Sequence, residues 1–141
     1  MNDNKSKSIL LIDASSRRAT YLKSLIKNSR DKINIVTAFS AEKARNIMNK
    51  RNKPFAFIAC YAYLPDSEGL IFAEEIKRKS PDISILLYAN DETYINKCKE
   101  HSGCLNAINL SNTELFFNFF SYGLEKDNDK GGFMLMKDCF K

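Results

Sequence analysis

FAFIACYAYLPDSEG, at residues 55–69, joins a short apolar run to a loop that contains proline and glycine. Residues 55–60 are apolar and rich in phenylalanine, a pattern that predicts a buried strand. The strand is expected to end just before Tyr61, and Pro65 and Gly69 mark the loop that follows. A fully buried strand of this kind is typical of a parallel sheet that is covered on both faces.

Strand and helix patterns alternate along the rest of the chain, with short connections between them. The other predicted strands are Ile9–Ile12, Ile33–Thr37, Ile83–Leu87 and Leu105–Ile108. The predicted helices follow Ser15 or Ser16, Ser40, Gly69 and Asp91, and the last helix covers about residues 113–125. Five strands that alternate with five helices predict an α/β fold of the flavodoxin-like type, a doubly wound parallel sheet in the order 2-1-3-4-5.

The length of the chain, 141 residues, suits a single domain. We expect a polar, disordered head at residues 1–7, the folded domain at residues 8–125, and a polar linker with a short apolar tail at residues 126–141. The start lacks the apolar stretch of a signal peptide, and no segment approaches the roughly 18 apolar residues of a membrane span. These features predict a cytoplasmic protein without a membrane partner.

The cysteines and the single histidine do not form a metal-binding pattern. There is no Cys-x-x-Cys pair, and His101 alone cannot complete a recognisable zinc ligand set. We expect small apolar residues or free thiols at Cys60, Cys98, Cys104 and Cys139. The sequence also shows no nucleophile with an adjacent base and no glycine-rich phosphate loop, so neither a metal, a cofactor nor an enzymatic activity is expected.

Positive charge is concentrated in the first part of the chain. Residues 1–53 contain 13 Lys and Arg against 4 Asp and Glu, whereas the rest contains 9 against 13. Such an asymmetry can mark a surface for nucleic acid or for an acidic protein. The cations are interleaved with Asn and Ser and lack the aromatic stacking groups of a single-strand binder, which favours solvated outer faces of two helices.

The strand at residues 55–60 and its loop resemble the third strand and following loop of the receiver domain of bacterial response regulators. In that family an aspartate four residues before the loop proline takes the phosphoryl group, and Tyr61 stands at that position here. The resemblance extends over about residues 8–125 and can be followed at the other strand ends. The family's two adjacent Mg²⁺-binding acids match Asp13 and Ala14, and its Ser or Thr after the fourth strand matches Tyr88.

Two further family positions lie on or after the fifth strand. The lysine that neutralises the phosphoryl charge matches Leu110, and the aromatic residue that reports the switch matches Ala107. Among all these positions only Asp13 keeps the family's residue. The resemblance therefore implies a degenerate phosphorylation pocket, made of Asp13, Ala14, Tyr61, Tyr88 and Leu110.

The replaced residues remove the chemistry of phosphotransfer. A tyrosine hydroxyl, whose pKa is ordinarily near 10, is neutral at pH 7 and cannot form an acyl phosphate. One aspartate beside a tyrosine is a poor site for Mg²⁺, which prefers close carboxylate oxygens. Leu110 supplies no counter-charge for a phosphoryl group. Phosphorylation by a histidine kinase is therefore not expected.

Several roles stay open for these residues. Asp13 can cap the following turn or retain residual metal binding, and Tyr61 and Tyr88 can serve as packing residues or form a ligand-contacting or modified site. In another interpretation the alignment with receiver domains shifts, so that Asp66 is the phosphoryl acceptor. That interpretation would need an acid cluster around Asp66 that the sequence does not supply.

The last predicted helix carries an unusually wide apolar surface. Projected at about 100° per residue, its apolar arc spans roughly 220°, about twice what one sheet face can cover. We expect the uncovered part to be a partner interface, formed by Phe116, Phe117, Phe120 and Leu124. The alternative is that the tail at residues 126–141 folds over it.

Two hypotheses about function follow from the sequence. The first is a pseudo-receiver that acts by phosphorylation-independent protein–protein interaction or dimerisation through the last helix. The second is a nucleic-acid or small-ligand binding module that uses the basic first half or the altered pocket. The first is favoured, because a protein surface accounts for the aromatic helix and the basic residues do not form a stacking platform.

Overall fold

The computed structural model describes residues 7–29, 33–101, 106–112 and 114. Five strands form one parallel sheet in the order β2-β1-β3-β4-β5, which confirms the predicted strand order. The strands are β1 (Lys7–Ile12), β2 (Ile33–Ala38), β3 (Phe57–Tyr61), β4 (Ser84–Ala89) and β5 (Asn106–Asn109). The helices are α1 (Ser16–Ser29), α2 (Ala41–Lys50), α3 (Gly69–Lys79) and α4 (Glu92–His101).

The described residues thus hold four helices where five were predicted. The predicted fifth helix, at about residues 113–125, lies outside the described residues except for Glu114. None of the helices within the described part of the chain has the length and apolar character needed to cross a lipid bilayer.

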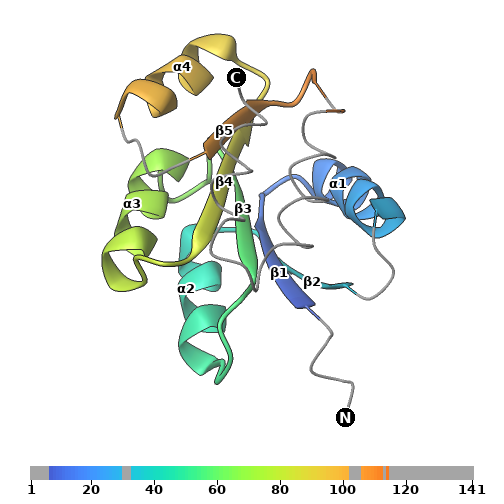
Figure 1. Cartoon of the computed structure of the whole chain (residues 1–141), viewed down its shortest axis with the longest axis vertical. Helices are drawn as coiled ribbons and strands as arrows, with labels where there is room; N and C mark the ends of the chain where they lie inside the picture. Colours follow the sequence, from blue (N-terminus) through green and yellow to red (C-terminus); the bar gives the residue numbers. More distant parts are fainter. Residues whose placement is uncertain (1–6, 30–32, 102–105, 113, 115–141) are drawn as a thin grey trace.

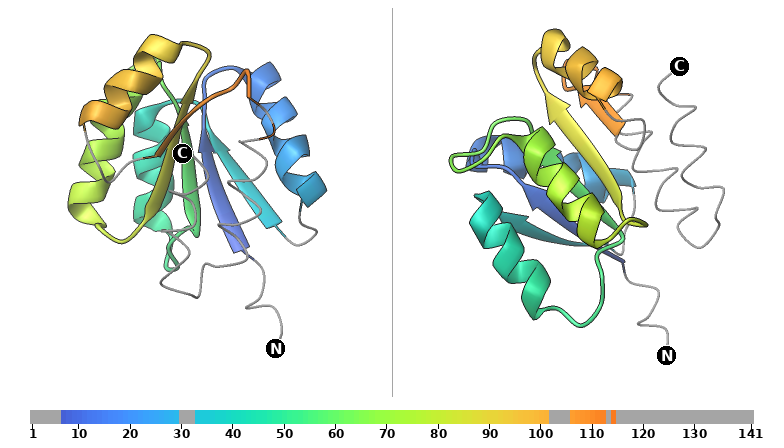
Figure 2. Two further views of the ribbon diagram at one scale, coloured as in Figure 1. Left: turned by 45° about the horizontal axis from the view of Figure 1, so that its top comes forward. Right: turned by 90° about the vertical axis from the view of Figure 1, so that its left-hand side faces the viewer.

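The sheet separates two hydrophobic layers of side chains. Helix α1 lies on one face, and α2 and α3 lie on the other (Figures 1 and 2). Successive side chains of a strand point to opposite faces, so Leu10 and Ile12 of β1 pack with α2 and α3, whereas Ile9 and Leu11 pack with α1. All four are fully buried, which explains why β1 appears in the sequence as an unbroken apolar run.

Local sequence signals position the helices as expected. The Ser15 hydroxyl accepts a hydrogen bond from the Arg18 backbone N–H (3.1 Å), and the Ser40 hydroxyl accepts one from Lys43 (3.1 Å). Asp91 caps α4 in the same way, through the Thr93 N–H at 3.0 Å. Helix α3 ends at Lys79, two residues before Pro81, because proline cannot continue a helix.

The end of β1 at Ile12 and the start of β2 at Ile33 were predicted correctly, and the other predicted strand boundaries were wrong by one or two residues. The predicted head included Lys7, but Lys7 is the first residue of β1 and pairs with Ile33 of β2. Strand β3 begins at Phe57 and includes Tyr61, which pairs with Tyr88 of β4. The reason is that hydrogen bonding to the neighbouring strand, and not the hydropathy of a side chain, sets where a strand begins and ends.

Candidate functional site

The carboxyl ends of the central strands meet at one edge of the sheet. Asp13 directly follows β1, Tyr61 ends β3, and Tyr88 lies in β4 beside Tyr61. In an open α/β sheet this edge, where the strand order reverses between β1 and β3, is where functional sites form. The structure brings three of the predicted pocket residues, Asp13, Tyr61 and Tyr88, together there.

Asp13 is the centre of this cluster and is fully buried. One carboxylate oxygen, Oδ1, accepts hydrogen bonds from the Ser15 backbone N–H (2.9 Å) and from Arg18 Nη2 (2.8 Å). The other, Oδ2, accepts from Arg18 Nε (2.7 Å) and from the Tyr88 hydroxyl (2.8 Å). A carboxylate offers about four lone-pair sites in total. All of them are therefore in use.

Arg18 is the member of the site that the sequence analysis missed. It lies in the first turn of α1, and its guanidinium both forms the two-pronged bond to Asp13 and stacks on the Tyr61 ring, 3.5 Å from the ring centroid. Partial burial lowers the pKa of Arg18, but the bond to Asp13 and the nearby charge outweigh it and raise that pKa. The signal for this contact was present as an arginine five residues after the strand-end acid.

Tyr88 closes the cluster from the side of β4. Its side chain is fully buried, and burial, strengthened by the adjacent charge of Asp13, raises the pKa of its hydroxyl well above the ordinary value. The hydroxyl therefore stays protonated and donates to Asp13 at any physiological pH. Tyr88 is thus held as a neutral hydrogen-bond donor.

The arrangement around Asp13 tests whether the site suits the Mg²⁺ ion that the resemblance implies. A metal would need a free carboxylate oxygen, and every acceptor position of Asp13 is taken by Ser15, Arg18 or Tyr88. Within the described ranges no group of three or more His, Cys, Asp or Glu side chains is placed to hold a metal ion. The residues at this site do not fit Mg²⁺.

The remaining members of the predicted pocket contribute no charge to it. Ala14 is exposed beside Asp13. Leu110 is half-buried, and it packs, like Tyr61, against the hydrophobic layer that contains Tyr88.

A row of four tyrosines runs from the buried cluster, past the exposed Tyr63, to the buried Tyr94 of α4. The ring centroids are 5.6 Å apart between Tyr88 and Tyr61, 5.8 Å between Tyr61 and Tyr63, and 5.1 Å between Tyr63 and Tyr94. The Tyr94 hydroxyl accepts a hydrogen bond from the Leu70 N–H at the start of α3 (2.9 Å). The row thereby links β4, β3, α3 and α4.

Asp66 does not join the strand-end cluster. Its oxygens accept hydrogen bonds from the Ala41 and Glu42 backbone N–H groups, both at 2.9 Å, so it caps the start of α2 from the loop after β3. The hydrogen bond from Ala41 lowers the pKa of Asp66, and the bond from Glu42 lowers it further by a smaller amount. Together they outweigh desolvation, which raises that pKa. This role leaves no support for Asp66 as a phosphoryl acceptor.

The Asp66 cap predicts a pH dependence of stability. Because the pKa of Asp66 is lower in the folded chain than its ordinary value of 3.8, its contribution is complete above pH 3.8 and is lost as the pH falls through the folded value. Urea unfolding of Asp66→Asn between pH 6 and pH 2.5 should therefore show a shallower acid loss of stability than the unchanged chain. Asp82→Asn, at an exposed turn, is the matched control for removing one carboxylate. Parallel curves for the unchanged chain and Asp66→Asn would contradict this assignment.

The two cysteines that the structure describes are buried in the core. Burial raises the pKa of the Cys60 thiol far above its ordinary value, and burial raises that of Cys98 to about 11. Both thiols stay protonated at pH 7, as expected for small core residues. Cys104, Cys139 and the predicted partner-interface residues lie outside the described residues.

The fold is that of signal receiver domains. No family model and no curated protein sequence matches the chain. Among solved structures, the signal receiver domain of an HD domain-containing protein from Pseudomonas fluorescens Pf-5 matches with a TM-score of 0.73 and 18% identity, over 89% of this chain and 92% of that one. A two-component response regulator from Clostridium difficile matches with a TM-score of 0.71 and 20% identity, over 88% and 100%.

A third structure is the BeF3-activated receiver domain of DrrB, a Thermotoga maritima OmpR/PhoB homologue, with a TM-score of 0.69 and 18% identity. It matches over 85% of this chain and 98% of that one. At this level of identity the likeness concerns the fold, which agrees with the sheet order 2-1-3-4-5 found here.

Proposed function

We propose that this chain is a pseudo-receiver, a signalling domain of the two-component type that does not take a phosphoryl group. It acts by phosphorylation-independent protein–protein interaction or by forming a homodimer, and it is not an enzyme. The observation that carries this proposal is the saturation of Asp13 by Arg18, Ser15 and Tyr88.

Phosphotransfer at this edge of the sheet would need a metal ion and a carboxylate acceptor. Arg18 holds the single acid with a guanidinium, so a positive charge is already fixed where Mg²⁺ would have to bind. Tyr61 offers a phenol under that guanidinium in place of an acceptor carboxylate. The site is electrically balanced without a phosphoryl group, which favours a permanent structural state over a switch.

The partner surface in this proposal is the predicted last helix, with Phe116, Phe117, Phe120 and Leu124 as contacts. Its support is the apolar arc of roughly 220°, which exceeds what one sheet face buries. Light scattering over a concentration series separates the two forms of the proposal. A homodimer predicts a doubled mass that Phe117→Ser lowers, whereas a constant monomer mass means that the partner is a different protein.

The absence of phosphoryl chemistry gives a direct prediction. Addition of Mg²⁺ and beryllofluoride to the full chain should leave its mass by light scattering and its amide spectrum unchanged. The DrrB receiver domain, which was solved in its BeF3-activated state, is the positive control. A saturable, Mg²⁺-dependent change at the amides of residues 13–18 would refute the proposal.

The variant Tyr61→Asp separates the two obstacles to phosphotransfer. It restores an acid at the acceptor position, but Arg18 still covers Asp13 and would pair with the new carboxylate as well. We expect Tyr61→Asp to remain silent to Mg²⁺ and beryllofluoride. A response of this variant alone would show that the acceptor, and not the closed Asp13, limits the chemistry.

A further inference from the structure

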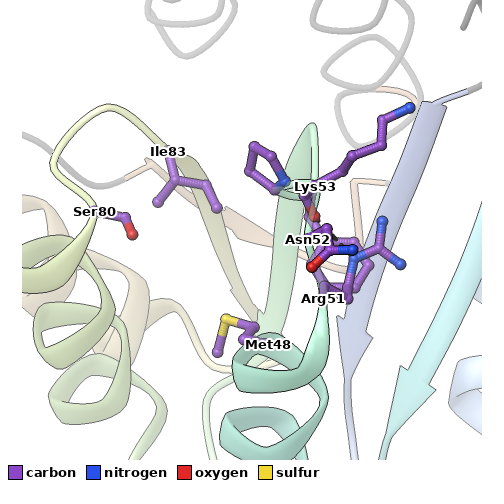
Figure 3. Close-up of a pocket in the computed structure, with 8 residues that line it drawn as sticks. Met48, Arg51, Asn52, Lys53, Ser80 and Ile83 are labelled. Carbon is purple, nitrogen blue, oxygen red and sulfur yellow. Dashed lines mark hydrogen bonds between the residues drawn. The ribbon is translucent and has the colours of Figure 1, made fainter.

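A cavity lies beside the amino-terminal ends of β3 and β4, whereas Asp13 lies at the carboxyl ends of the strands. It has a volume of about 260 Å³ and is bounded by the end of α2, the α2–β3 loop and the α3–β4 turn (Figure 3). Met48, Phe55 and Ile83 give it an apolar lining, and Asn52 and Ser80 contribute polar groups. We call it the loop cavity.

Both walls of the loop cavity are fixed by hydrogen bonds from cations to backbone carbonyls. On one side Lys77 Nζ donates to the carbonyls of Pro81 and Ile83, both at 2.8 Å. On the other side Arg51 Nε donates to the Lys53 carbonyl (3.1 Å), and the Arg51 guanidinium stacks 3.9 Å above the Phe55 ring. The cavity is therefore pre-formed, and an occupant would not have to order its walls.

A second cavity of about 190 Å³ continues the first between α2 and α3. The two share Met48 and Ser80 in their linings. The second is also lined by Lys79 and by the Arg45–Glu75 pair, whose Nε–Oε2 distance is 2.7 Å. Together they form one groove, which we call the α2–α3 groove.

The groove is positively charged. The loop cavity is lined by Arg51 and Lys53 and by no acid, and Figure 3 shows both side chains extending from the α2–β3 loop to the side away from Ser80 and Ile83. The second cavity adds Lys79, while its one acid, Glu75, is already paired with Arg45. An apolar floor beneath unbalanced cations fits an occupant that is apolar at one point and acidic around it.

The size of the cavities selects the kind of occupant. The loop cavity, at about 260 Å³, has room for one aliphatic or aromatic side chain, and the cations in its lining favour carboxylates beside that side chain. The chain's own tail does not match, because residues 126–141 carry four Lys against three Asp. A second copy is less favourable than a separate acidic peptide, because two chains that each have a net charge of +5 repel each other.

We propose that the α2–α3 groove is a second interaction surface, which binds a short acidic peptide segment of a partner protein. One apolar side chain of the segment enters the loop cavity, beside Met48 and Ile83. The flanking carboxylates lie over Lys53, Arg51 and Lys79. This surface is independent of the last helix and of the closed site at Asp13.

The test uses the full chain, labelled with ¹⁵N, and a synthetic pentapeptide with a central leucine and two glutamates on each side. Saturable amide shifts are expected at Met48, at residues 51–56 and at residues 80–83. Replacing the four glutamates with lysine removes the carboxylates that face the cations, and replacing the leucine with alanine removes the side chain that enters the loop cavity. Each change should weaken binding at least about tenfold.

Variants of the chain locate the site. Ser80→Phe, at an exposed residue, places a ring in the shared lining and should abolish the shifts. Lys53→Glu should weaken binding about three- to tenfold, whereas Lys99→Glu, an equal change of charge on exposed α4, should change it less than twofold. Thermal unfolding of each variant confirms that it is folded.

Three outcomes would overturn the proposal. The first is no saturable shift up to about 5 mM peptide, or a shift that Ser80→Phe leaves intact. The second is a Ser80→Phe variant whose free spectrum changes at residues 126–141, which would make the tail the occupant. The third is a set of groove shifts that depends on protein concentration without peptide, which would make a second copy the occupant.

Discussion

Asp13→Ala is expected to lower the free energy of unfolding by about 3 kcal/mol, because removing one partner of a buried ion pair leaves the other without compensation. Arg18 would keep its charge with its side chain only 24% exposed, and Tyr88 would lose its carboxylate acceptor inside the core. Urea unfolding followed by circular dichroism measures the change.

A second ion pair in the same molecule provides the matched control. Arg45 and Glu75 form the same two-pronged geometry between α2 and α3, but their side chains are 39% and 24% exposed. Glu75→Ala should therefore cost about 0.5 kcal/mol. Equal losses for Glu75→Ala and Asp13→Ala would show that burial does not strengthen the Asp13 pair.

A double-mutant cycle isolates the contribution of the pair itself. The losses of Asp13→Ala and Arg18→Ala should not add, and we expect a coupling of about 2 kcal/mol between them. A coupling near zero would mean that Asp13 acts through Ser15 and Tyr88 alone.

Gly69→Ala is the second substitution with a large expected effect, a loss of about 3 kcal/mol through overpacking. Gly69 begins α3, and its N–H donates to the Ala62 carbonyl at 2.7 Å. A Cβ atom there would collide with the Tyr61 carbonyl oxygen and come within 3.1 Å of Ala62. These neighbours are backbone atoms of β3 and its loop, so α3 would have to move away from the sheet.

The expected loss of stability in Gly69→Ala comes from the close approach of α3 to β3 and not from the backbone angles of Gly69. No described residue has a positive φ, so the angles themselves suit any amino acid. Asn96→Ala, at an exposed position of α4, is the control and should change stability by less than about 0.5 kcal/mol. A comparably small loss for Gly69→Ala would show that the start of α3 shifts without strain.

Sequence patterns were sufficient for the sheet order and for the helix caps at Ser40 and Asp91. Ser40 and Asp91 each bond within three residues of their own position, so spacing identifies them, whereas spacing left Ser15 and Ser16 both open as the cap of α1. The alternation of buried strands with helices similarly leaves few topologies. The predicted strand boundaries were less accurate, because a strand's ends depend on which residues of the neighbouring strand it pairs with.

The composition of the site was only partly accessible from sequence. The convergence of Asp13, Tyr61 and Tyr88 follows from their strand-end positions. The sequence shows an arginine five residues after Asp13, but the bridging role of Arg18 also depends on the direction in which α1 leaves β1. The capping of α2 by Asp66 joins positions 25 residues apart, and it likewise needed the three-dimensional structure.

The loop between β3 and α3 is held from both sides. Asp66 bonds it to α2, while Tyr63 bonds to Asp91 (3.2 Å) and Glu68 to Lys97 (3.0 Å) on the side of α4. Under the proposed function, the domain does not signal through a change in its own conformation. Its output would then be set by how many copies are present, so that synthesis, turnover and the margin of folding stability become the points of control.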